Sequence, residues 1–166
     1  MVERTRWFRR MLIAGGVVGV LSFAVFTQNA GAQSYAHNNG PGVAVTVRGS
    51  VSQTVDRLKK MVADNGMMVM GELYQGKVLA MTGLSVESET VFVGNPNVGK
   101  KLFSAEPGVG VAVPVRVNIY KDANGRTAVR YVPPTQQLGA FGNSGVNKVC
   151  QMLDGKLKNM VSMLPQ

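Results

Sequence analysis

The chain has 166 residues, a formal net charge of +9, one cysteine and one histidine. The single cysteine, Cys150, excludes an intramolecular disulfide. With only His37 beside it, the chain cannot build a zinc or haem site from several His or Cys ligands. The basic residues are scattered without interleaved aromatic residues, which argues against a nucleic-acid-binding protein.

Residues 1–32 have the three parts of a cleavable secretory signal peptide. Four arginines precede an uncharged apolar run over 11–26, and the small residues Ala30 and Ala32 follow it. A run of about 16 residues is short for a membrane anchor, which needs about 20. We therefore expect export to the periplasm or the medium, with cleavage after Ala32. Phe8 stands where a twin-arginine signal prefers Ser or Thr, so the general secretory route is favoured.

Cleavage there leaves residues 33–166, a length that suits one domain with one core. The signal carries four of the 18 basic residues and one of the nine acidic residues, so the remainder has a net charge of +6. This charge favours anionic partners by general electrostatics, but dispersed surface charge is the preferred interpretation. Residues 33–42 are rich in Asn, Gly and Ser and are expected to form a flexible leader.

Hydrophobic periodicity predicts a single α/β (α+β) domain. A capping box of Ser50 and Gln53 begins the first helix, and Asn65-Gly66 ends it. Strands are expected over residues 43–48, 67–73, 90–93, 109–119 and 127–132, and helices over 51–64, 75–82, 97–105 and 149–164. Their order predicts a mixed sheet of about five strands packed by helices, with one antiparallel hairpin closed by a type I′ turn at Asn124-Gly125.

Residues 139–166 are interpreted as a linker, flexible over 139–145, followed by an amphipathic helix. Leu153 and Leu157 belong to its apolar stripe, and Lys156 lies largely opposite. We expect this stripe to pack on the domain. The alternative is association with the cell envelope through the basic helix.

Residues 94–101 read Gly-Asn-Pro-Asn-Val-Gly-Lys-Lys and resemble a phosphate-binding P-loop between a strand and a helix. The last position is Lys101, where the motif needs a Ser or Thr hydroxyl for Mg²⁺. No Asp follows a later apolar strand as a second metal ligand. We therefore interpret the segment as a structural turn.

The same turn belongs to a wider pattern. A capped helix ending in Gly is followed by an apolar strand, a strand that enters Gly-Asn-Pro-x-x-Gly, a Val-Pro step, an Asp-x-x-Gly hairpin and a Tyr-x-x-Pro ending. These parts are Ser52 to Gly66, Met67 to Leu73, Val91 to Gly99, Val113-Pro114, Asp122 to Gly125 and Tyr131 to Pro134. From about Ser50 to Leu138 the chain resembles the domain-of-unknown-function 302 family. Residues 43–138 are accordingly expected to form that domain, with the C-terminal helix outside the resemblance.

The resemblance implies a compact α/β fold, often dimeric, without an assigned general activity. Many members carry Asp-His at the start of the second helix, where this chain has Tyr74-Gln75. Neither residue titrates near neutral pH, so we expect no acid–base or metal role for that pair here. Backbone donors of the Gly-Asn-Pro turn could hold an anion, although a fixed turn ending the strand is the stronger interpretation.

No catalytic or metal-binding residues are predicted, and no cofactor. The acidic residues show no carboxylate pair at a recognisable spacing, and Cys150 is interpreted as a buried thiol. Met67, Met68 and Met70 are interpreted as core-filling residues rather than copper ligands. The predicted ligand-binding residues are Gly94, Asn95, Pro96, Gly99, Lys100 and Tyr74.

The first hypothesis for function is an exported, non-enzymatic module that binds a small or anionic ligand or a protein partner, as a homodimer. Nucleic acid is not expected as a partner, nor a membrane span after cleavage. The second hypothesis is an enzyme that combines Tyr74 or Glu72 with backbone donors of residues 94–99. It requires these groups to lie within hydrogen-bond reach of one site. Envelope association through the C-terminal helix is the third.

Overall fold

The structure is a computed structural model and describes residues 40–166. The predicted signal peptide, His37 and most of the predicted leader lie outside these residues. The described chain contains five strands, β1 (Val43–Val47), β2 (Met68–Leu73), β3 (Ser88–Gly94), β4 (Val115–Lys121) and β5 (Thr127–Tyr131). Its α-helices are α1 (Val51–Asp64), α2 (Gln75–Ala80), α3 (Pro96–Ala105), α4 (Pro134–Leu138) and α5 (Ser144–Ser162), with 3₁₀ turns η1 (Pro107–Val111) and η2 (Gly139–Phe141).

The five strands form one sheet in the order β1-β5-β4-β3-β2. The α/β class and the number of strands are confirmed, but every pairing is antiparallel, so the expected mixed sheet is wrong in that detail. A strand–helix–strand order gives parallel neighbours only when the helix crosses over between them. Here α1 connects the two edge strands, and α2 and α3 connect antiparallel neighbours at the ends of the sheet.

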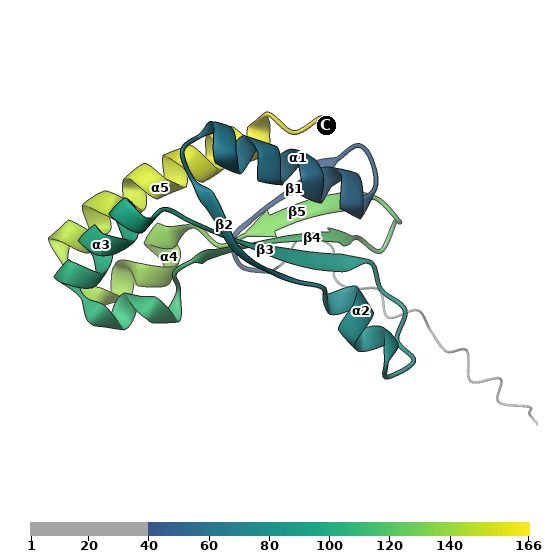
Figure 1. The fold of residues 1–166 in the computed structure, drawn as a ribbon, viewed down its shortest axis with the longest axis horizontal. Helices are drawn as coiled ribbons and strands as arrows, with labels where there is room; N and C mark the ends of the chain where they lie inside the picture. The colour runs from purple at the N-terminus through teal and green to yellow at the C-terminus, as the bar shows by residue number, and fades with distance from the viewer. Residues whose placement is uncertain (1–39) are drawn as a thin grey trace, which may run out of the picture. The chain divides into compact units, whose positions relative to one another are not determined.

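Helices α1 and α5 lie side by side on one face of the sheet (Figure 1). Alternate side chains of the central strands point into the core between the sheet and these two helices. Val91, Val117 and Ile119 are examples, and none of the three is exposed. The capping box of Ser50 and Gln53 is confirmed at the start of α1. On the opposite face Ser88 and Thr90 both donate to the Asn118 side chain.

The predicted strand over residues 109–119 is wrong in its first half. Pro107 fixes the backbone angle of a 3₁₀ turn, and the Glu106 carboxylate caps it by accepting the Gly108 N–H at 3.0 Å. In a strand, Val109 and Val111 would point to the same face. Instead Val109 is buried in the core and Val111 is exposed, as the 3₁₀ turn requires. Strand β4 begins only at Val115, after Pro114, which has no N–H to donate to a ladder.

The hairpin between β4 and β5 is confirmed, but its turn is not the expected two-residue type I′ turn. The Gly125 N–H donates to the Asp122 carbonyl at 2.9 Å, and the Asp122 N–H donates to the Arg126 carbonyl at 2.8 Å. The connection therefore has three residues. Gly125 takes a positive φ of 72°, as the last residue of such a connection requires.

The C-terminal segment is part of the core. Residues 139–145, expected to be a flexible linker, contain the 3₁₀ turn η2 and the first residues of α5. Leu153, Leu157, Met160 and Leu164 are all at most 4% exposed. Their stripe is therefore unavailable to a membrane, which removes the basis for envelope association through this helix. No helix within residues 40–166 is long and apolar enough to cross a bilayer.

Packing of α5 can be tested by stability. Leu157→Ala should lower the free energy of unfolding by about 2–5 kcal/mol, because it leaves a cavity in the core. Met163→Ala, at a side chain that is 57% exposed, should change it by no more than about 0.5 kcal/mol. Urea unfolding followed by circular dichroism measures both values. Equal, small effects would show that α5 is not packed as described.

Candidate functional site

A pocket of about 230 Å³ lies at the end of the sheet where β3 leads into α3. Strands β3 and β4 and the segment between η1 and β4 contribute Val93, Val113, Pro114 and Val115 to its wall. Helix α3 contributes Val98, Leu102 and Phe103, and α5 contributes Leu153. The lining side chains are hydrocarbon apart from those of Met70 and Asn95, so the interior suits an apolar group.

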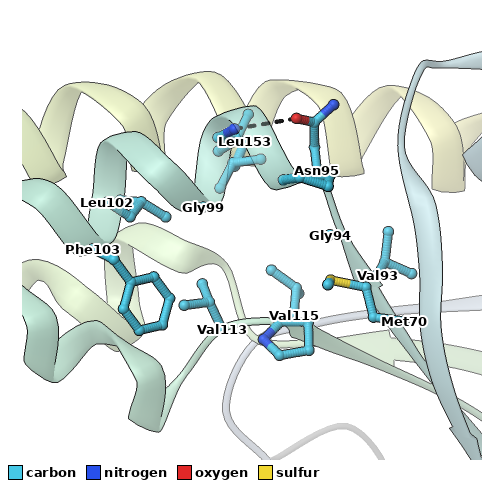
Figure 2. A pocket seen from close by; sticks show the side chains of 13 residues that line it. Met70, Val93, Gly94, Asn95, Gly99, Leu102, Phe103, Val113, Val115 and Leu153 are labelled. Atoms are coloured by element: carbon cyan, nitrogen blue, oxygen red, sulfur yellow. Dashed lines mark hydrogen bonds between the residues drawn. The ribbon is translucent and has the colours of Figure 1, made fainter.

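Two partly exposed side chains flank this pocket. Met70 is 55% exposed and Phe103 is 46% exposed, and Figure 2 shows them on opposite sides of the space. Exposed apolar side chains beside an apolar hollow mark its opening. We call the part of the pocket between Met70 and Phe103 its mouth.

Met70 reaches the pocket because β2 is irregular. The register with β3 shifts between Val69 and Gly71, so Met70 is the extra residue of a β-bulge, and bulges redirect side chains in this way. Its Sδ lies against Gly94, so closely that an added Cβ at this position would clash with the sulfur atom. The interpretation of Met68 and Met70 as core residues is therefore wrong, because Met68 is 48% exposed, whereas Met67 is buried.

Four of the six predicted ligand-binding residues line the pocket, namely Gly94, Asn95, Pro96 and Gly99. Their role differs from the expected one. The Asn95 Oδ1 accepts from the N–H groups of Asn97 at 2.8 Å and Val98 at 3.1 Å. Pro96 has no N–H, so the first donors of α3 are already used by the chain itself. The segment is a helix cap, and it leaves no donors at this helix start for an anion.

Asn95 also ties α3 to the chain that follows α1. Its Nδ2 donates to the Gly66 carbonyl at 2.6 Å, while its Oδ1 caps α3. Figure 2 shows the Asn95 side chain at the edge of the pocket, with one of its capping bonds drawn. The side chain thus fixes the wall of the pocket rather than offering a free polar group.

Tyr74 lies at the other end of the sheet. Leu73 pairs with Thr90, whereas Met68 pairs with Gly94, so Tyr74 and Gly94 are separated by at least four residues of strand, or about 13 Å. This distance exceeds hydrogen-bond reach. An enzyme site that combines Tyr74 with residues 94–99 is therefore not formed.

The Tyr74 end holds a polar cluster that the sequence did not reveal. Glu72 Oε1 accepts from Lys59 Nζ at 2.7 Å, and Glu72 Oε2 accepts from the Tyr74 hydroxyl at 3.0 Å. Glu89 lies on the same face, two residues from Val91, the pairing partner of Glu72. Antiparallel pairing brings together two carboxylates that are 17 positions apart, a spacing with no recognisable pattern.

The two carboxyl groups of this cluster have opposite electrostatic environments. The hydrogen bond from Lys59 is the main cause that lowers the pKa of Glu72. Burial, and then interaction with the Glu72 carboxylate, raises the pKa of Glu89. The cluster therefore favours one ionised and one more readily protonated carboxyl group.

Gln75 and Cys150 contact only other parts of the fold and do not line the pocket. The Gln75 amide nitrogen donates to the Thr90 hydroxyl, which continues the polar row on the open face of the sheet. Cys150 is fully buried, and burial raises the pKa of its thiol, which confirms the interpretation as a buried residue. Within residues 40–166 no group of three His, Cys, Asp or Glu side chains could hold a metal ion.

Comparisons with known proteins agree on the family. The model of the family described as domain of unknown function DUF302 matches residues 43–164 and so includes α5, which the sequence resemblance left outside. Among solved structures, the chain is similar to the crystal structure of an uncharacterized conserved DUF302 protein from Bacillus stearothermophilus. The two are 20% identical with a TM-score of 0.68, and the match covers 72% of this chain and 94% of that one. A comparison with curated proteins gives no match.

The carboxyl pair predicts a pH-dependent stability difference. A raised pKa in the folded state means that ionisation of Glu89 costs stability as the pH rises through that pKa. Glu89→Gln should therefore raise the melting temperature by a few degrees at pH 7, with the gain disappearing towards pH 4, where Glu89 itself is protonated. Glu87→Gln, at a neighbouring position, is the control. A gain of the same size at both pH values would contradict the assigned environment of Glu89.

Proposed function

The chain belongs to the DUF302 family, and we propose that it is an exported, non-enzymatic binding domain whose pocket beneath the β3–α3 turn holds a small apolar ligand. The apolar lining of this pocket is the observation that carries the proposal. Its volume of about 230 Å³ exceeds the roughly 150 Å³ of an engineered cavity that binds benzene. A ring with a short side chain, or a medium-length alkyl chain, would fit.

The proposal favours binding over catalysis because of the groups at the pocket. No lining side chain is ionisable. In the one amide side chain, that of Asn95, the nitrogen donates a hydrogen bond and the oxygen accepts one within the protein. The ionisable cluster around Glu72 and Tyr74 lies at the opposite end of the sheet. An apolar hollow without a proton donor or acceptor can bind and release a molecule, but it offers no group for acid–base chemistry.

Gly99 provides a way to close the pocket without damaging the fold. It lines the pocket, and an added Cβ there would meet no atom within 4 Å. Gly155 is the matched control, because it lies on exposed α5 surface and an added Cβ also meets nothing within 4 Å. Replacing either by Leu should favour its helix by up to about 1 kcal/mol.

We predict that the purified protein binds 1-octanol with a Kd between roughly 10 μM and 1 mM, about 4–7 kcal/mol. Isothermal titration calorimetry measures this affinity. Gly99→Leu should abolish binding, because the new side chain occupies the pocket, while Gly155→Leu should bind as the wild type does. Failure of the wild type to bind octanol or alkylbenzenes, or equal binding by both variants, would refute the apolar-ligand proposal.

Export is the second part of the proposal and rests on the pattern of residues 1–32. Expression of the whole chain in a bacterial host should give a soluble protein in the periplasmic fraction. Its intact mass should correspond to a chain that begins at Gln33, after cleavage behind Ala32. A mass that includes residues 1–32 in the cytoplasmic fraction would refute export.

Further partners remain predictions. The homodimer that the family resemblance implied would need an exposed apolar surface, and α2 and its surroundings offer one. Val78 is 54% exposed, Met81 is 87% exposed and Leu84 is 45% exposed. None of the residues of α2 is buried in the single chain.

A further inference from the structure

Helix α3 carries a lysine next to residues that line the pocket. Lys100 follows Gly99 directly and stands three residues before Phe103, and residues three apart on a helix are neighbours on its surface. Lys100 is exposed. None of the ion pairs among residues 40–166 includes it. Among the described residues, Lys100 is therefore an unpaired cationic residue on the helix surface next to Phe103, at one flank of the mouth.

The interior of the pocket cannot hold a charged group. Its lining contains no ionisable side chain, and burying an unpaired charge there would be costly. The Asn95 side chain and the first N–H groups of α3 are already hydrogen-bonded. An anionic group on a bound molecule can therefore be accommodated only at the mouth, which is open to solvent.

We propose that the ligand is an amphiphilic carboxylate, with its hydrocarbon part in the pocket and its carboxylate at the mouth beside Lys100. This inference rests on the proposed function and adds the chemical class of the ligand. The ligand would then be both small and anionic, as expected from the sequence. Its negative charge, however, would be recognised by the Lys100 side chain and not by the Gly-Asn-Pro backbone. The net charge of +6 over residues 33–166 also favours an anionic ligand over a cationic one.

The test compares octanoate with 1-octanol, which share a chain length and differ in charge. Both affinities are measured by calorimetry at pH 8 and low ionic strength, for the wild type, Lys100→Gln and Lys101→Gln. The quantity of interest is the ratio of the octanol Kd to the octanoate Kd, because intrinsic differences in solvation between the two ligands cancel when this ratio is compared between variants. Lys101 is the control, since it neighbours Val98 in the wall of the pocket and stands two residues from Phe103, so it lies on α3 away from the mouth.

We expect Lys100→Gln to lower this ratio two- to fivefold, the effect of an exposed ion pair, and to leave octanol binding unchanged. Lys101→Gln should leave the ratio as it is. Addition of 0.5 M NaCl should lower the wild-type ratio towards that of Lys100→Gln, because salt screens exposed charges.

The outcomes separate this inference from the proposal beneath it. If neither ligand binds the wild type, the apolar pocket is not a binding site and the proposed function fails. If both bind and Lys100→Gln leaves the ratio unchanged, the pocket stands and the amphiphile assignment is overturned. Equal losses in the two lysine variants would also overturn it, because they would show a general effect of net charge.

Discussion

Both ends of the Asn95 side chain are used in hydrogen bonds, and the arrangement of the pocket depends on them. The carbonyl oxygen caps α3, and the amide nitrogen holds the Gly66 carbonyl at the end of the α1 segment. These bonds set the angle at which α3 leaves β3 and its position relative to the start of β2. The Asn95 amide thus holds the start of α3, the helix that carries Phe103, while the β-bulge of β2 directs Met70 to the other flank of the mouth.

Local signals were sufficient to predict much of the fold. The capping box of Ser50 and Gln53, the alternating valines of β1 and the apolar stripe of α5 each depend on neighbours within a few positions. The same alternation led to the wrong prediction of a strand at Val109 and Val111. Valines two positions apart can also occur in a 3₁₀ turn, so a few alternating residues do not identify a strand. Pro107 and Pro114, on either side of that segment, were the signals that could have corrected the prediction.

The candidate site was predicted only in part, for a physical reason. Gly94 and Gly99 were recognised from the turn, but an apolar pocket is formed by side chains from strands and helices that lie far apart in the sequence. Met70 joins it only through a β-bulge, for which Gly71 inside the strand pattern was the one available signal. The Glu72–Glu89 pair likewise depends on the register between two strands, which the sequence leaves open.

The contribution of α5 to the core has a consequence for when the protein can fold. Strand β1 pairs with β5, and the Arg48 N–H donates to the Pro165 carbonyl at 2.7 Å. Segments that are synthesised early therefore bond with segments that are synthesised late. Until α5 leaves the ribosome, the face of the sheet that it covers stays open to solvent and the chain cannot close its core. Such late closure leaves apolar surface of the newly made chain exposed until synthesis is nearly complete, and exposed apolar surface is what makes an incomplete chain prone to aggregation.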